Sequence, residues 1–350
     1  MILLPKVPLH LDLNKVGIDL YAKLAVAHSD RDALAAMLRS GIASQSVACA
    51  ALYDFGFKQE AVQFKPDIDL NPELLRSARN LCQTDAPLDM AVLLSSVPFR
   101  FNGEYYPRDQ PLYRMNFSDG KAAYCKSRNI LQEATGLALL RELGLPSYGY
   151  ELTGDYIVLE GIPGRTLLDH ALFSGKDSSH MAEQPAKSSS SILAVVAFDY
   201  IFGMMDRNER GVLSDGQQVF CVDHEYLFTY FPQSIQVQEL INYARYAELF
   251  GLVLDPAQTA AAEKVFDFAR SKKSAIAIIL TDYVRTSPKV DLSFEKRTLD
   301  QGIVDKTTER IELGLAEFMR VLTEACGSII QYMEAEYAKF LRSRDRCNNS

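Results

Sequence analysis

The feature that most constrains the fold is an apolar segment that ends in a polar loop and is followed by a strand, a turn and a second strand. Residues 192–204 are almost entirely apolar, which predicts a buried helix. The loop after it carries Asp206, and the apolar run Val219–Val222 ends at Asp223. Because Ser214-Asp215-Gly216 is a turn signal, the short runs on either side of it should pair. Two carboxylates that emerge from buried elements can therefore converge on one site.

Asp206 and Asp223 have the chemistry that phosphoryl transfer requires. A substrate hydroxyl needs an acceptor for its proton, and Mg²⁺ needs hard oxygen ligands, so the two carboxylates can divide these roles. His224 follows directly; it either contacts phosphate or is a structural histidine that is hydrogen-bonded to the loop backbone. Glu225 is either a further metal ligand or a structural or exposed residue.

A second group of predicted elements lies upstream, in the order strand, strand, helix, strand, strand. Short runs of aromatic and β-branched residues are separated by turn signals, which predicts paired strands. Between the two pairs, an apolar stripe at helical spacing is closed by Gly144 and Pro146. The predicted strands are 112–117, 122–126, 148–152 and 156–160, and the predicted helix is 130–143.

Lys126 and Glu133 are the candidate ion pair of this upstream group. Lys126 ends the second strand and Glu133 lies in the first turns of the following helix, so the geometry permits contact. In phosphoryl transfer a helical glutamate holds such a lysine against the nucleotide phosphates, but the same pair is also common on solvated surfaces. The segment Glu160–Leu167 is either a hinge that offers backbone groups to adenine or a simple Pro-Gly loop.

Taken together, these segments resemble two groups of kinases. The upstream part is similar to the N-lobe and hinge of aminoglycoside and choline phosphotransferases, at Lys126, Gln132–Ala134, Leu143–Pro146, Leu159–Glu160 and Gly164–Leu167. The downstream part resembles phosphatidylinositol-kinase-like and HipA-like kinases, at Gly203, Asp206-Arg207 and Val222-Asp223. The resemblance extends over Leu112 to Phe228 and comes from the order and spacing of short motifs.

The resemblance implies an α+β fold of the bilobed protein-kinase-like type, with a small mixed N-lobe and a mainly helical C-lobe. The segment before it is mainly helical in pattern and predicts an N-terminal helical extension. The expected regions are 1–95 as a helical accessory region, 96–165 as the N-lobe and hinge, and 166–350 as the C-lobe, which ends in a long helix from about Glu309 to Leu341.

The resemblance also implies roles for individual residues. Lys126 is expected to contact the phosphates and Glu133 to anchor it. Asp206 is the expected catalytic-loop aspartate, Arg207 is expected to brace that loop, and Asp223 is the expected magnesium ligand. Glu160, at the hinge, completes the expected nucleotide-binding residues.

Two departures from the family pattern bear on activity. The position where these kinases usually carry a metal-binding Asn is occupied by Gly211, so one magnesium ligand is missing there. Asn208 is the candidate replacement, as in some atypical secretory-pathway kinases that also lack the usual Asn. The stretch 97–112 contains Gly103 as its only glycine, so it holds no glycine-rich phosphate clamp.

The expected activity is that of an atypical kinase that uses ATP and Mg²⁺ to phosphorylate a hydroxyl, with Ser or Thr of a protein favoured as acceptor. One alternative is a small-molecule phosphotransferase acting on aminoglycoside-like or choline-like substrates. Others are a pseudokinase or interaction module, suggested by Gly211, and a kinase homologue that transfers AMP.

Composition limits the partners and the compartment. With 350 residues and 48% apolar residues, the chain can bury a substantial core. Its net charge of −8 argues against broad binding to nucleic acid or anionic membranes, and no apolar run predicts a membrane span or a secretory signal. The six cysteines form no CxxC pair, which indicates a reducing compartment and no structural zinc. We expect a cytoplasmic protein; a secreted effector acting in a reducing host cytosol fits the same features.

Overall fold

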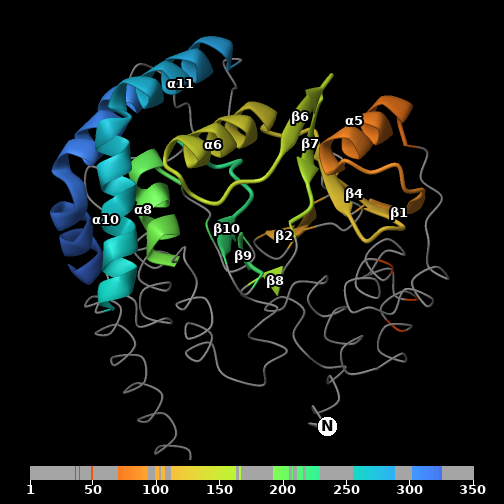
Figure 1. Ribbon diagram of the computed structural model, residues 1–350, viewed down its shortest axis with the longest axis horizontal. Helices are drawn as coiled ribbons and strands as arrows, with labels where there is room; N and C mark the ends of the chain where they lie inside the picture. Colours follow the sequence, from red (N-terminus) through yellow and green to blue (C-terminus); the bar gives the residue numbers. More distant parts are fainter. Residues whose placement is uncertain are drawn as a thin grey trace, which may run out of the picture. The chain divides into compact units, whose positions relative to one another are not determined.

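The computed structural model describes residues 70–93, 99–101, 104–106, 112–162, 165–166, 192–204, 207, 211–215, 218–228, 255–287 and 302–324, together with Ala36, Arg39 and Cys49. The chain divides into two compact units. The first comprises residues 1–130 and 148–162, and the second comprises residues 131–147 and 163–350. Each unit has its own sheet (Figure 1). Each also has its own buried side chains.

The first unit is built on an antiparallel sheet of five strands. Their order across the sheet is β1 (Leu88–Leu93), β4 (Leu112–Phe117), β5 (Ala122–Lys126), β7 (Tyr156–Glu160) and β6 (Tyr150–Thr153). The predicted hairpins 112–126 and 148–160 are both confirmed, with β6 beginning at Tyr150. A separate ribbon pairs β2 (Phe99–Phe101) with β3 (Glu104–Tyr106).

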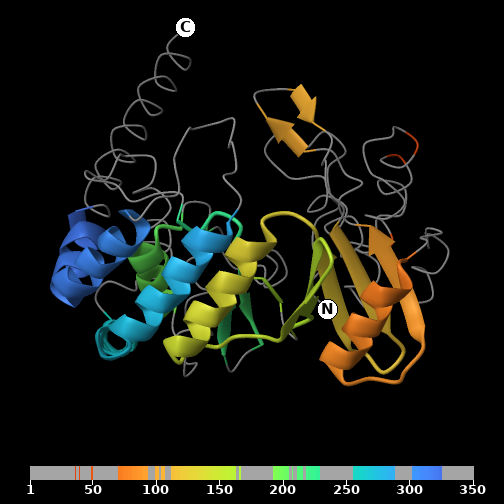
Figure 2. The ribbon, with the colours of Figure 1, turned by 90° about the horizontal axis from the view of Figure 1, so that it is seen from above.

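Helix α5 (Pro72–Cys82) covers one face of this sheet (Figures 1 and 2). Its buried residues recur at helical spacing and pack against inward residues of the strands, because alternate strand residues point to the same face. The resulting core comprises Leu74, Ala78, Cys82, Met115, Phe117, Ala123, Cys125 and Val158. The Asn71 side chain caps the start of the helix, and the Lys121 ammonium donates to the carbonyls of Cys82 and Gln83 at its end.

Strand β1 and helix α5 come from the segment that the sequence analysis assigned to an accessory region, residues 1–95. In the structure β1 pairs with β4 and α5 packs on β5, β6 and β7, so both belong to the sheet unit. The expected boundary between residues 95 and 96 stays a prediction, since most of the residues before α5 lie outside the described part of the chain.

The second unit is mainly helical. It contains α6 (Ile130–Glu142), α8 (Ile192–Phe202), α10 (Pro256–Ser271), α11 (Lys273–Thr286) and the helical residues 302–324. A small antiparallel sheet has the order β10 (Val219–Cys221), β9 (Val212–Ser214) and β8 (Arg165–Thr166). The predicted helices at 130–143 and 192–204 and the predicted strand pair around residues 214–216 are confirmed.

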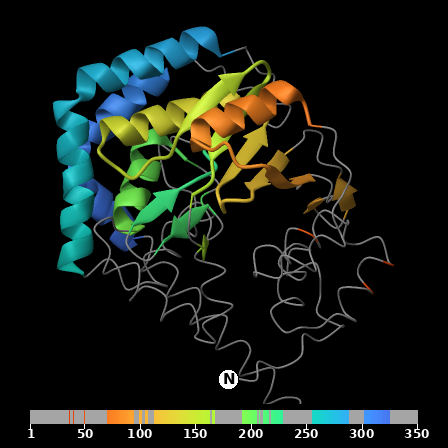
Figure 3. The ribbon, with the colours of Figure 1, turned by 45° about the vertical axis from the view of Figure 1, so that its right-hand side comes forward.

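Helix α8 forms the centre of the second unit, with α10 packed along it (Figure 3). All 11 of its residues are buried, as expected for a helix that is apolar on every side. The ring of Tyr200 lies 6.5 Å from that of Phe266 and 5.4 Å from that of Phe318. Such tilted aromatic pairs fix α8 against α10 and the helical residues 302–324. Within the described residues, no helix combines the length and the apolar character needed to cross a membrane.

Helix α6 joins the second unit, although the sequence analysis assigned its residues to the N-lobe. Residues 131–147 group with 163–350 because α6 carries two buried residues, Glu133 and Gly136, that contact the segment after β10. The helix ends at Glu142, and Gly144 follows with φ of +65°, the left-handed conformation common just after helix ends.

Candidate functional site

The site begins with a buried carboxylate in the apolar helix α8. Asp199 is its one charged residue, and its side chain is 1% exposed. The helix stops at Gly203, whose φ of +63° suits glycine. Burial raises the pKa of the Asp199 carboxyl, and the nearby Arg207 guanidinium opposes that rise. A carboxylate in such surroundings needs a cationic partner to stay charged.

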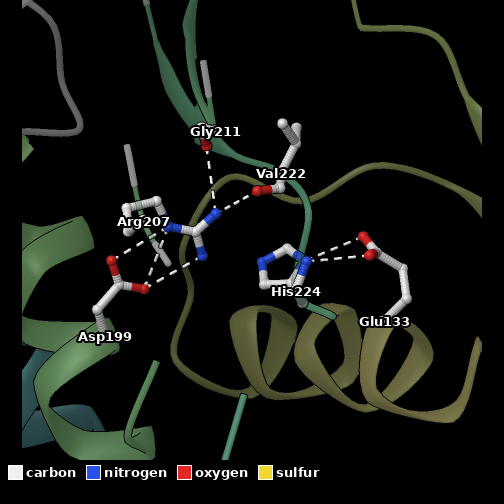
Figure 4. Close-up of polar contacts among 6 residues, drawn as sticks. All are labelled: Glu133, Asp199, Arg207, Gly211, Val222 and His224. Atoms are coloured by element: carbon white, nitrogen blue, oxygen red, sulfur yellow. Dashed lines mark hydrogen bonds and ion pairs between the residues drawn. The ribbon is translucent and has the colours of Figure 1, made fainter. Parts of the chain in front are cut away.

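Arg207 supplies that partner and also reaches the backbone of the following hairpin (Figure 4). Its Nε lies 3.1 Å from Oδ2 of Asp199 and its Nη2 lies 3.1 Å from Oδ1. The remaining nitrogen, Nη1, donates to the carbonyl of Gly211 at 3.3 Å and to the carbonyl of Val222. One guanidinium, itself only 3% exposed, therefore links α8 to both ends of the β9–β10 hairpin.

Gly211 lies where this hairpin begins and is closely surrounded. Its carbonyl also accepts a hydrogen bond from the N–H of Val222 at 2.9 Å. A Cβ at position 211 would lie 3.3 Å from Cδ and Nη1 of Arg207 and from the oxygen of Val222. A side chain at 211 would therefore fit tightly against Arg207 and the Val222 carbonyl, which would have to shift by a few tenths of an ångström.

Asp223 follows Val222 and is the exposed residue of this cluster. It has φ of +66°, in the left-handed region that aspartate enters more often than most other non-glycine residues. The peptide group before it is held through the Val222 carbonyl by Arg207. The peptide group after it is held through the His224 N–H, which donates to Oε2 of Glu133 at 2.9 Å. Buried charged residues thus fix the backbone on both sides of Asp223.

His224 and Glu133 form a second buried pair. Both side chains have an exposed fraction of 0%, and Nδ1 of His224 lies 3.1 Å from Oε1 of Glu133. An ionised Glu133 carboxylate at this distance would accept a hydrogen bond from a protonated Nδ1. The imidazole also meets the ring of Phe198 edge-on, with centroids 6.0 Å apart. These contacts favour the structural interpretation of His224, with Glu133 as its partner.

Gly136 allows α6 to approach His224 closely. A Cβ at this position would lie 2.6 Å from Cγ of His224 and 2.7 Å from Cδ1 of Leu227, distances that require atoms to move. The glycine in the middle of α6 is therefore explained by packing, although it weakens the helix by about 1 kcal/mol relative to alanine.

We expect Gly136→Ala to destabilise the protein in spite of the better helix propensity of alanine. Overpacking of a core costs about 1–3 kcal/mol, which exceeds the gain of about 1 kcal/mol in propensity. Urea unfolding measures the net change. The matched control is Ala138→Gly in the same helix, which reports the propensity difference alone; a stabilised Gly136→Ala variant would contradict the close packing.

Lys126 and Glu160 lie in the first unit. Lys126 is half-buried at the end of β5, between Leu112 of β4 and Ile157 of β7 in the strand register. Glu160 ends β7; its Oε2 accepts from the N–H of Gly149 at 3.0 Å, and its own N–H donates to the Gly149 carbonyl. The Glu160 side chain thus has a local structural partner, and the nucleotide-binding roles of both residues stay predictions, as does the Lys126–Glu133 ion pair.

Asp206 and Asn208 lie outside the described residues, on either side of Arg207 in the chain. Of the expected metal ligands, the structure therefore describes Asp223. Within the described part of the chain, no group of three His, Cys, Asp or Glu residues gathers as a metal site. Burial raises the pKa of the Cys221 thiol to about 12, so this neighbour of the site stays protonated near neutral pH and is no nucleophile.

Asp199 was not among the predicted site residues, although the residues around it indicate a buried ion pair. A single acidic residue in an otherwise apolar, buried segment requires a partner, and Arg207 is the first basic residue after the segment. Of the predicted site residues, Arg207 contacts Asp199 and Glu133 contacts His224 (Figure 4). Asp223 lies in the chain between Val222 and His224, whose backbone groups Arg207 and Glu133 hold.

Comparisons with known proteins find similarity at the level of structure. No protein-family model and no curated protein sequence matches the chain. A Helicobacter pylori proinflammatory kinase, CtkA, is similar with 12% identity and a TM-score of 0.36, over 65% of this chain and 94% of that chain. The FAT and kinase domain of CtTel1 is similar with 13% identity and a TM-score of 0.39, over 90% of this chain and 31% of that chain. The open conformation of CtTel1 matches with 12% identity and a TM-score of 0.41, over 88% of this chain and 15% of that chain.

Proposed function

We propose that the protein is an atypical kinase that uses ATP and Mg²⁺ to transfer the γ-phosphate to a hydroxyl, most favourably Ser or Thr of a protein. The observation that carries the proposal is the placement of Asp223. This carboxylate is exposed at the end of a buried strand, in a left-handed backbone conformation, with its neighbouring peptide groups held by Arg207 and Glu133. A costly conformation that is held from both sides is typical of a functional position.

The proposed chemistry divides between two aspartates and a lysine. The substrate hydroxyl oxygen bonds to the γ-phosphorus, the bond from that phosphorus to the β–γ bridging oxygen breaks, and ADP leaves. Asp206 accepts the hydroxyl proton, and Lys126 contacts the phosphates. The sequence resemblance supports these two roles, and Arg207, next to Asp206 in the chain, is held by Asp199 of α8.

The donor set at Asp223 fits magnesium. A carboxylate is the hard oxygen ligand that Mg²⁺ prefers, and Mg²⁺ is usually held by one or two carboxylates with the substrate phosphates and water completing its shell. Asp223 would hold the ion, with Asn208 as the proposed second ligand. When bound, the ion neutralises the negative charge of the phosphates. A single firmly placed carboxylate is therefore compatible with metal binding even though Gly211 replaces the usual Asn.

The test measures transfer from γ-labelled ATP with Mg²⁺ to the protein itself, to generic protein substrates and to a lysate. We expect labelling of serine or threonine by the wild type and its loss in Asp206→Ala, whose thermal unfolding should stay close to the wild-type value. The matched control is Asp282→Asn, an exposed aspartate of α11. Thermal shift with ATP should show stabilisation that requires Mg²⁺ and is lost in Asp223→Asn.

Other outcomes would identify the alternatives. ATP consumption with a cationic metabolite and no protein labelling would indicate a small-molecule phosphotransferase. A product that carries AMP by mass spectrometry would indicate an inverted nucleotide. Absence of both transfer and Mg²⁺-dependent stabilisation would overturn the kinase proposal in favour of a pseudokinase, the alternative that Gly211 suggests.

A further inference from the structure

We propose that Asp199 is a positioning residue for Asp223, and that it acts through Arg207. The expected effect on the affinity of Asp223 for Mg²⁺ rests on the proposed function. The structural part, that Asp199 fixes the backbone at Asp223, stands on the described contacts alone.

In the first step from Asp199 to Asp223, the nitrogens of the Arg207 guanidinium contact two sets of acceptors. Nε and Nη2 both point to the Asp199 carboxylate, so that the planar guanidinium is held in one orientation. That orientation leaves Nη1 directed at the carbonyls of Gly211 and Val222. A guanidinium held at two points loses little further freedom when it makes its remaining bonds. Asp199 therefore determines where Nη1 lies.

The second step links Nη1 to the conformation of Asp223. The Val222 carbonyl belongs to the peptide group whose rotation sets φ of Asp223. Aspartate enters the left-handed region more readily than most non-glycine residues but populates the right-handed regions more often, so an external contact on this peptide group favours the observed orientation. Arg207 provides that contact, and it is buried, where a charge-assisted hydrogen bond is strong.

The third step concerns the metal. Residues that orient a ligand without touching the ion typically change metal affinity by about 10–100-fold when they are replaced. Asp199→Asn keeps the shape of the side chain but replaces one carboxylate oxygen with an amide nitrogen, which cannot accept from Arg207. The guanidinium then loses one of its two fixed points, and Asp223 should sample other backbone conformations.

The structural part is tested by hydrogen exchange on the ligand-free full chain. In Asp199→Asn we expect faster amide exchange in peptides covering 219–228, with little change in α10 peptides. A uniform acceleration across the chain, or none at 219–228, would overturn the proposal. If Asp199→Asn does not fold, Asp199→Glu is measured instead, because it retains both carboxylate oxygens but places them one methylene further from α8. Amide exchange at 219–228 equal to that of the wild type would then contradict the proposal that Asp199 fixes the orientation of Arg207.

The functional part is tested by titrating Mg²⁺ at saturating ATP and following the thermal shift. We expect the half-maximal Mg²⁺ concentration to rise about 10–100-fold in Asp199→Asn, and stabilisation by ATP without Mg²⁺ to stay unchanged. Asp282→Asn breaks an exposed Asp–Arg pair. It should leave unchanged both the half-maximal Mg²⁺ concentration and the stabilisation by ATP without Mg²⁺. A lower melting temperature with an unaltered Mg²⁺ requirement would show a merely structural role. Absence of Mg²⁺-dependent stabilisation in the wild type would reject the proposed function. Hydrogen exchange would then still test whether Asp199 fixes the backbone at Asp223.

Discussion

Arg207→Ala is expected to lower the free energy of unfolding by about 3–5 kcal/mol, because it leaves the buried Asp199 carboxylate without its cation. The variant also removes the donor to the carbonyls of Gly211 and Val222. Urea unfolding at neutral pH measures the loss. Arg285→Ala, which breaks the exposed pair with Asp282 on α11, should cost less than about 1 kcal/mol.

The loss in the free energy of unfolding caused by Arg207→Ala should become smaller at low pH. With the guanidinium gone, burial raises the pKa of the Asp199 carboxyl without opposition from Arg207. A carboxyl whose folded pKa exceeds its unfolded value stabilises the fold at low pH, and this contribution disappears as the pH rises through the folded pKa. The difference from the wild type should therefore narrow as the pH falls through the raised folded pKa of Asp199. A difference that widens on acidification would contradict the assignment of Asp199 as the unpaired group.

Glu133→Ala is expected to cost about 2–5 kcal/mol, because it removes the acceptor for two buried donors of His224, each of which costs about 1–3 kcal/mol when left unsatisfied. These are the backbone N–H at 2.9 Å and Nδ1 at 3.1 Å. Glu133→Gln keeps one acceptor oxygen and should fall between the wild type and Glu133→Ala. The measurement is again urea unfolding.

The control for Glu133 lies in the same helix. Glu142 pairs with Lys272 at 3.8 Å near the surface, so Glu142→Ala should change stability by less than about 1 kcal/mol. If Glu133→Ala were equally mild, the Glu133–His224 pair would not hold the segment after β10. Hydrogen exchange at 219–228 should increase in Glu133→Ala, because the peptide group after Asp223 loses its acceptor.

Most of the local elements could be predicted because their signals are local. The hairpins 112–126 and 148–160, the helix α6 and the helix α8 follow from alternation, apolar runs and turn residues. Strand β1 was not predicted. Its six residues form a strand by pairing with β4, which is distant in the sequence. Strand formation that depends on such a partner is not visible in the local residue pattern.

The candidate site was predictable in part. The sequence identified Asp223 at the end of a buried strand, and it identified Glu133 and Arg207 through the family resemblance. Its ion pair between Lys126 and Glu133 stays a prediction, and it did not predict the contact of Glu133 with His224. That contact depends on the packing of α6 beside β10, which sequence spacing does not reveal.

By itself, the sequence determined the two hairpins of the first unit, the helices α6 and α8 and the strand pair that ends at Asp223, since these properties depend on neighbours in the chain. Only the tertiary structure decided that Asp199 and Arg207 pair, that Gly136 admits His224, and that the backbone on either side of Asp223 is held by the buried residues Arg207 and Glu133. The physical reason is that burial of a charge has to be offset by a specific partner, and the partners come together only when α6, α8 and the β9–β10 hairpin pack.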